Sequence, residues 1–384
     1  IDTMKNLFLL IALTISALTS AQFHKTYTWQ EKPTQSKLSP KDAKEPSVAI
    51  FEKYTVDFAG NPGNYSVFET THSLVRVNDE RGIQQQNKVY IPMYSVKNIV
   101  DIKARTISPN GAVKLLDANN IKEVQNVEEY GDFKIFAIEG VQKGSEIEVL
   151  YTVEKEFYPF GSETLQKDYP IKKVEFTLIY GNLNARLKPY FTEAQFTEQQ
   201  IGGKASKKLV VENIPAMVDE EYATPNANKT SVAYQCFAPG VNLTDEMLWN
   251  NVVNNVADGF FPEEVSKSIT LEADAVIKEA GTEVYQRVLL LDDYIKNNFN
   301  VIKNNNEQLG DVEYIVKTRT ASAIGIAKLY AHFLRAINID YEAVITANRF
   351  ETKFDPDFFN PSVLREFLIF IPELKQYISP DRIE

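Results

Sequence analysis

The sequence predicts a multidomain protein in which an N-terminal β-sandwich is followed by an α+β domain. Two observations lead to this fold class. Short runs with strand-like alternation, separated by turn residues, fill residues 47–238. Beyond Pro239 the pattern changes to the helical period, and residues 317–344 combine a helix that is apolar on most sides with a turn and a β-prone segment.

Composition limits the classes of function. The chain has 384 residues, of which 44% are hydrophobic and 24% charged, a balance typical of two or three globular domains. A formal net charge of −11 offers no basic surface for phosphates, so we expect no nucleic-acid partner. The sequence has no glycine-rich phosphate loop and no metal-ligand spacing of histidines, so we predict neither a cofactor nor a metal.

The first 21 residues have the pattern of a secretory signal. Residues 1–3 precede Met4 as upstream sequence, a lysine follows at position 5, and residues 7–18 form a short apolar run. Small residues up to Ala21 predict cleavage before Gln22. The apolar run is too short to span a bilayer, so we expect an exported protein, periplasmic or extracellular, without a transmembrane span in its mature chain.

The next segments are a predicted linker and the predicted β-sandwich domain. Residues 22–46 are polar and lack periodicity, which favours a linker or a loosely packed segment that Trp29 could anchor. Strand-like runs then recur through residues 47–238, with turn signals such as Asn61-Pro62-Gly63 and Ser108-Pro109-Asn110-Gly111 between them.

Helical patterns fill residues 239–384. Helices are predicted over residues 243–256, 262–279 and 283–298, the last with Thr282 as its N-cap. A buried helix then ends near Ile337 and leads through a turn into a strand from residue 341. The sequence stops at Glu384 soon after a further β-prone run, and we expect this domain to be incomplete at its C-terminus.

The buried helix carries a resemblance to a known family. Its end, Phe333-Leu334-Arg335-Ala336-Ile337-Asn338-Ile339, resembles the L-L-R-A-x-G-I that closes the nucleophile helix of transglutaminase-like, papain-fold proteins. Counting back along that motif, the family's cysteine falls on Ala323. The two downstream strands of the family are similar to residues 364–374 and 377–381, which brings its histidine to Glu366 and its aspartate to Ser379.

The resemblance therefore implies a degenerate Cys-His-Asp triad. Alanine has no thiolate to attack a carbonyl group, so we predict no catalytic residue at Ala323, Glu366 or Ser379. A different chemistry, with Glu366 as base and Ser379 as nucleophile, stays open beside the simpler interpretation that the two side chains fill the vacated cleft by hydrogen bonding.

A second resemblance covers the β-rich region. Ala104-x-Thr106-x-x-Pro109-x-Gly111, Val141-x-x-Gly144-Ser145-x-Ile147-x-x-x-Tyr151 and Leu165-Gln166-x-x-x-Pro170-Ile171 are similar to a bacterial domain family of unknown function. Asn213-Ile214-Pro215-Ala216 resembles its closing segment. Domains of that family precede transglutaminase-like cores in exported proteins, so the resemblance implies the same order here.

Other residues that could carry chemistry have simpler interpretations. Cys236, the single cysteine, is expected to be a buried apolar residue of a strand, and a thiolate nucleophile is the alternative. The histidines, His24, His72 and His332, are far apart in sequence. A calcium site would draw on Asp355, Asp357, Asp381 and Glu384. Aromatic residues of the last domain are expected in its core, with a stacking cleft as the alternative: Phe354, Phe358, Phe359, Phe367, Phe370 and Tyr377.

The sequence leaves three functions open. The favoured one is an exported, non-catalytic binding or scaffold protein whose ligand is a peptide, a glycan or another protein. The second is an active transglutaminase- or protease-like enzyme that uses other residues on peptide or cell-wall amides. The third is a structural envelope protein that assembles through exposed strand edges. The sequence does not predict an oligomeric state.

Overall fold

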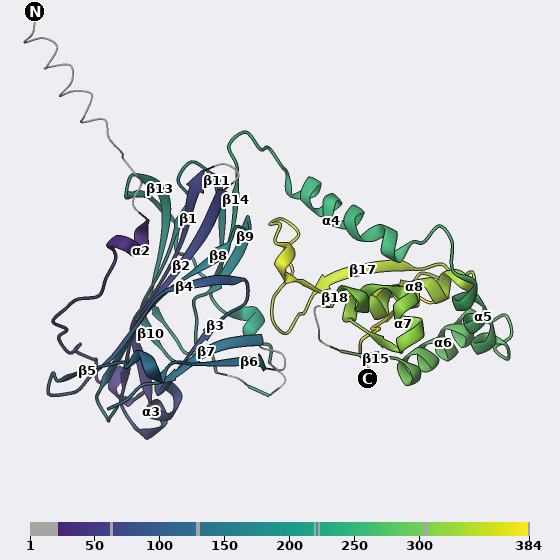
Figure 1. The fold of residues 1–384 in the computed structure, drawn as a ribbon. Helices are drawn as coiled ribbons and strands as arrows, with labels where there is room; N and C mark the ends of the chain where they lie inside the picture. The colour runs from purple at the N-terminus through teal and green to yellow at the C-terminus, as the bar shows by residue number, and fades with distance from the viewer. Residues whose placement is uncertain are drawn as a thin grey trace, which may run out of the picture. The chain divides into compact units, whose positions relative to one another are not determined.

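The computed structural model describes residues 22–61, 64–127, 131–218, 220–221, 223–302 and 306–382 (Figure 1). The predicted signal sequence lies outside these residues. The chain forms two compact units, the first made of Ile1–Ala223 and Lys229–Val241 and the second of Thr224–Asn228 and Asn242–Glu384. Within the described part of the chain, no helix is both long and apolar enough to cross a membrane.

The first unit is built on one eight-stranded sheet. All neighbouring strands run antiparallel except β1 and β10, which pair in parallel. The strands, in their order across the sheet, are β12 (Thr197–Ile201), β13 (Lys204–Ile214), β10 (Ile171–Ile179), β1 (Ser47–Asn61), β2 (Asn64–Val77), β8 (Glu146–Glu156), β4 (Val96–Ile107) and β5 (Val113–Leu115).

Two three-stranded sheets cover one face of the large sheet. One has the order β11 (Asn184–Tyr190), β14 (Ser231–Phe237), β9 (Phe160–Thr164), and the other has the order β3 (Lys88–Pro92), β7 (Gly131–Ala137), β6 (Lys122–Val127). Each encloses its own hydrophobic core. Val67 and Val77 of β2 belong to different cores yet point to the same face, because side chains alternate along a strand. The predicted strand-rich first half is confirmed.

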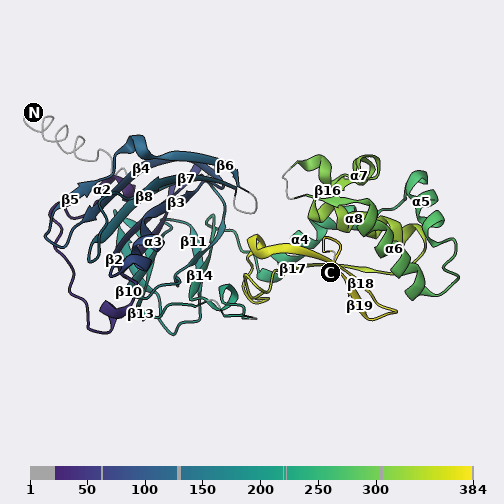
Figure 2. The same ribbon diagram turned by 90° about the horizontal axis from the view of Figure 1, so that it is seen from below.

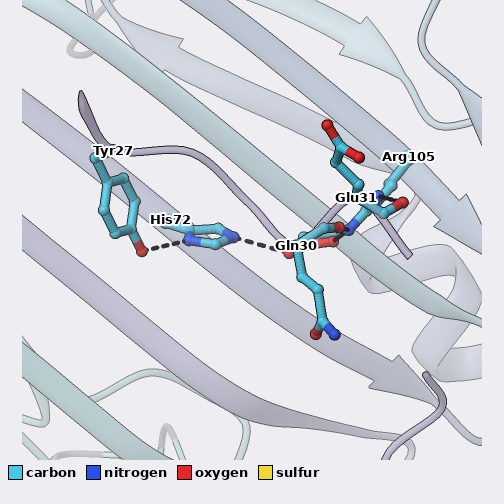
Figure 3. Close-up of polar contacts among 6 residues, drawn as sticks. Tyr27, Gln30, Glu31, His72 and Arg105 are labelled. Carbon is cyan, nitrogen blue, oxygen red and sulfur yellow. Dashed lines mark hydrogen bonds and ion pairs between the residues drawn. The ribbon is translucent and has the colours of Figure 1, made fainter. Parts of the chain in front are cut away.

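The opposite face of the large sheet carries a buried polar network that the N-terminal segment closes (Figure 3). The two ring nitrogens of His72 lie 2.7 Å from the Tyr27 hydroxyl and 2.9 Å from a Glu148 carboxylate oxygen. Arg105 donates to Glu148 at 2.6 Å and to the Gln30 main-chain carbonyl at 2.6 Å. His72, Arg105 and Glu148 are each no more than 5% exposed. The buried charges are thus paired, as their desolvation requires.

Further bonds fix the rest of this segment, which begins with α2 (Phe23–Thr26). The Ser36 amide donates to Glu146 at 2.9 Å, and Arg76 donates to the Ser36 carbonyl at 2.8 Å. The Gln35 side-chain nitrogen lies within 3.2 Å of the main-chain oxygens of Ile107, Ser108 and Gly144. We expected residues 22–46 to be a linker or loosely packed. They are instead a strap along the sheet, held by polar contacts that leave no periodic sequence pattern.

The second unit combines helices with short sheets. Its helices are α4 (Asp245–Phe260), α5 (Lys267–Ile277), α6 (Val284–Asn298), α7 (Val312–Thr318) and α8 (Ala323–Ala336). Strands β17 (Glu342–Ala347), β18 (Leu364–Ile371) and β19 (Gln376–Ile378) form an antiparallel sheet, and β15 (Asn300–Val301) pairs in parallel with β16 (Thr320–Ala321). The predicted helices and strand are present, although Glu283 and not Thr282 is the N-cap of α6.

Helix α8 is the centre of this unit. It packs against α4, α5, α6, α7 and β18 (Figure 2). Its buried residues lie on most sides, as the apolar sequence predicts: Gly325, Ile326, Ala327, Leu329, Tyr330, Ala331, Phe333 and Leu334. The helix ends where Asn338 adopts a left-handed φ of 55° and the Ile339 amide donates to the Leu334 carbonyl at 3.0 Å, a Schellman-type ending. The chain then enters β17.

Candidate functional site

The N-terminus of α8 positions the residue at which the family resemblance places a nucleophile. Ser322 is the N-cap, its hydroxyl accepting from the Gly325 amide at 3.2 Å and donating to the Leu309 carbonyl at 3.1 Å. Ala323 is the first residue of the helix and is half-buried. A thiol at this position would benefit from the helix dipole, which lowers the pKa of a cysteine at a helix N-terminus. The methyl group of Ala323 supplies no such chemistry.

The other two predicted positions lie on neighbouring strands. Glu366 is on β18, opposite Thr346 of β17, and Ser379 directly follows β19. Arg382 donates to Glu366 at 3.2 Å, and the Ser379 hydroxyl donates to Asp381 at 3.4 Å. The structure thus ties Glu366 to the segment that contains Ser379, and α8 packs against β18. Within the described residues, Ser379 has Asp381 and not Glu366 as its hydrogen-bond partner.

The cysteine and histidines do not rebuild a triad at these positions. Cys236 lies on β14 in the core of the first unit and is fully buried, and burial raises the pKa of its thiol well above its ordinary value. His24 and His72 belong to the first unit as well. His332 is on α8, where its ring bonds the Gly259 main chain, and desolvation by burial lowers its pKa. The expectation of a buried structural cysteine is confirmed.

We expect the Cys236 thiol to resist thiol-directed reagents in the folded protein. Both its burial and its raised pKa keep the reactive thiolate scarce. A chromogenic disulfide reagent at neutral pH should leave the native protein unlabelled over hours and should titrate one thiol at once in denaturant. Rapid labelling of the native protein would contradict the buried position of Cys236.

The acidic residues near the end of the chain do not assemble a cation site in the described part of the structure, where no group of three or more possible ligands occurs. Asp355 accepts from the Asp357 amide at 3.0 Å and Asp381 accepts from Ser379, so these carboxylates serve local turns. Glu384 lies outside the described residues.

Aromatic residues of this unit divide between core and surface. Phe358 and Phe359 are buried, as expected, whereas Phe354 is 40% and Tyr377 62% exposed. Trp249 packs edge-on against Phe359 and its indole nitrogen donates to the Pro356 carbonyl at 3.1 Å. Beside it lies an apolar pocket of about 250 Å³ between α4, β17 and β18, with lining residues that include Trp249, Val253, Phe261, Ile345, Phe354 and Leu364.

Sequence and structure comparisons agree with the coarse picture. Residues 63–218 match a family of domains of unknown function with solved structures, DUF3857, which confirms the resemblance found in the β-rich region. No curated protein matches the chain. The family model covers the first unit only, so the second unit is compared through structures.

One similar solved structure is that of a Parabacteroides distasonis protein described as a "putative protease". The two sequences are 16% identical. The matched region covers 87% of this chain and 67% of that chain, with a TM-score of 0.64. Two others are described as a "putative cysteine protease" from Cytophaga hutchinsonii (17% identity, 58% of this chain, 75% of that chain, TM-score 0.25) and as a "TGase" (10%, 55%, 52%, 0.20). The first likeness shows a shared fold, and the scores of the other two are too low to support an argument.

Proposed function

We propose that the protein is an exported, non-catalytic binding or scaffold protein, in which a β-rich domain at residues 47–238 precedes a degenerate transglutaminase-like domain at residues 239–384. The observation that carries the proposal is Ala323 at the first position of α8, where the family motif places a thiol. The signal-like residues 1–21 support export, and the ligand class is a peptide, a glycan or another protein.

The residues around Ala323 support a binding role and argue against catalysis by residues outside the family's triad positions. The single cysteine is in the first unit, and His332 is bonded to a main-chain group. Glu366 and Ser379 have separate partners, Arg382 and Asp381, so they do not form the base–nucleophile pair that an alternative enzyme would need. The apolar pocket beside Trp249 offers a surface for apolar groups of a ligand.

Restoring the triad tests the proposal. In a Cys236→Ser background, the triple variant Ala323→Cys, Glu366→His, Ser379→Asp should react quickly with a thiol-directed ester probe. The single variant Ala323→Cys is the matched control, because it has the thiol without its base, and it should react at least about tenfold more slowly. Labelling rates across pH 6–9 measure the difference.

The unmodified protein should stay inert toward peptide and cell-wall amides. Hydrolysis or amide transfer that disappears in Glu366→Ala would refute the non-catalytic proposal in favour of an enzyme. If the triple variant reacts no faster than Ala323→Cys, the assignment of Glu366 and Ser379 to the triad positions is wrong.

A further inference from the structure

A second site candidate lies in the first unit, between the two small sheets. It is a cleft of about 450 Å³, within the range of roughly 300–1,000 Å³ typical of small-ligand sites. Strands β1, β2 and β8 of the large sheet form its floor. Strand β3 forms one wall, and β9 with the residues after it forms the other.

The floor of the cleft interrupts an otherwise apolar sheet face. On β2, Val67 and Val75 pack into the hydrophobic core under β9, β11 and β14. Between them, Glu69, Thr71 and Ser73 occupy the intervening positions that point to the same face. These three residues are partly exposed, because the gap between the two small sheets leaves this part of the face uncovered. Their polar side chains offer hydrogen-bonding groups to a polar ligand in the cleft.

The carboxylates of the cleft are held in fixed positions. Glu52 of β1 is only 3% exposed and accepts hydrogen bonds from the hydroxyls of Tyr54 at 3.2 Å and Tyr169 at 2.9 Å. Glu69 pairs with Lys155 at 2.6 Å. Both Glu52 oxygens are thus engaged by tyrosine hydroxyls, and little of this carboxyl group is open to the cleft.

Glu163 faces these groups from the wall that β9 forms. It lies on β9, an edge strand, at the residue paired with Val232 of β14, and no hydrogen bond joins its carboxylate to another described residue. The titratable groups around it come from every neighbouring element: Glu52, Tyr54, Glu69, Tyr151, Lys155, Lys167 and Tyr234. Lys155 is paired with Glu69, and the charge of Lys167 acts on both Glu163 and Glu52. Lys88 is exposed on the far wall.

We propose that this cleft binds a ligand with a protonated primary amine, and that Glu163 receives the ammonium group. An ammonium ion has three donors and a full charge, which matches the Glu163 carboxylate, because no hydrogen bond or ion pair engages it among the described residues. The source we favour is a lysine side chain of a short peptide, because Thr71, Ser73 and Gln86 offer hydroxyl and amide partners for peptide groups along the cleft. The inference is independent of whether the second unit is catalytic.

Electrostatics supports this assignment. Desolvation by burial raises the pKa of Glu163 to about 7. A bound ammonium group stabilises the carboxylate form and so lowers this pKa, which means that binding below pH 7 releases a proton. Affinity should therefore rise by up to about tenfold per pH unit as the pH increases toward 7 and should level off above it.

Calorimetry with the full chain tests the proposal. The probes are the tripeptide Gly-Lys-Gly, its Nε-acetylated form, and 1,5-diaminopentane. Gly-Lys-Gly should bind at pH 8 and lose about tenfold or more of its affinity on acetylation. If the diamine binds as tightly as the peptide, recognition of the amine stands and a free polyamine is the source. Weaker binding of the diamine identifies the peptide.

Two variants separate the site from the fold. Glu163→Gln keeps the shape of the side chain and should weaken Gly-Lys-Gly binding at pH 8 by at least about tenfold while removing its dependence on pH below 7. Glu156→Gln, at the exposed end of β8, is the matched control and should change neither. Equal binding of the acetylated peptide, an unchanged affinity in Glu163→Gln, or no binding of either amine probe at millimolar concentration would overturn the proposal.

Discussion

Replacing Glu148 with alanine is expected to lower the free energy of unfolding of the first unit by about 3–5 kcal/mol. Among the residues the structure describes, Glu148 is the only carboxylate that contacts Arg105 in the buried network under the strap. Its removal leaves the Arg105 guanidinium, 3% exposed, without a counter-charge. It also leaves one ring nitrogen of His72 without its partner.

Trp29 provides the measurement, because its ring lies 4.3 Å from the Arg105 guanidinium. In a Trp249→Phe background, its fluorescence during urea unfolding reports on the strap and the sheet beneath it. Glu156→Ala is the control: Glu156 is on the same strand in an exposed ion pair with Lys97, so its loss should cost less than about 1 kcal/mol. Equal midpoints for the two variants would mean that the buried network adds nothing to stability.

Gly325→Ala is expected to destabilise the second unit by about 1–3 kcal/mol. A Cβ at Gly325 would lie inside the contact distance of the Leu309 carbonyl oxygen and close to Ile315, so the main chain would have to move. Helix propensity alone predicts the opposite sign, a gain of about 1 kcal/mol from replacing glycine in a helix. The sign of the change therefore decides between packing and propensity.

The control for this substitution is Gly310→Ala, in the neighbouring 3-10 helix η4 (Glu307–Gly310), where an added Cβ meets nothing within 4 Å. Thermal unfolding followed by circular dichroism should show a lower midpoint for Gly325→Ala and little change for Gly310→Ala. A higher midpoint for Gly325→Ala would show that α8 does not press against η4 as the structure describes.

The sequence was most informative where the period of the apolar residues alone identifies a helix or a strand. The helix from Ala323 was predictable because apolar residues recur at its period through Leu334 and because it is enclosed on most sides. The strands were predictable because their alternation separates a covered face from a more polar one. Cys236 was expected to be buried for the same reason, as part of an alternating strand.

Sequence reasoning missed the strap and the cleft, for different physical reasons. Gln35 and Ser36 anchor the strap through main-chain groups of distant residues, and such bonds leave no local period. Glu52 and Glu163 lie in strands whose alternation does not reveal which carboxylate is enclosed. The available signal was Glu52 within a β-prone run, where an apolar residue was expected, and only the pairing of Glu52 with Ser73 shows which side chains it meets.

The contacts of the strap join residues that are far apart in the sequence of the first unit. Tyr27 forms a hydrogen bond with His72. Arg105 donates to the carbonyl of Gln30, 75 residues away in the sequence, and the Ser36 amide donates to Glu146, 110 residues away. Strand β1 likewise pairs in parallel with β10, a partner made much later in synthesis. Contacts so distant in sequence slow folding, because the entropy of closing long loops is lost before the contacts form. The segment that follows the signal-like residues can therefore complete its contacts only after β4, which carries Arg105, and β8, which carries Glu146, have been synthesised.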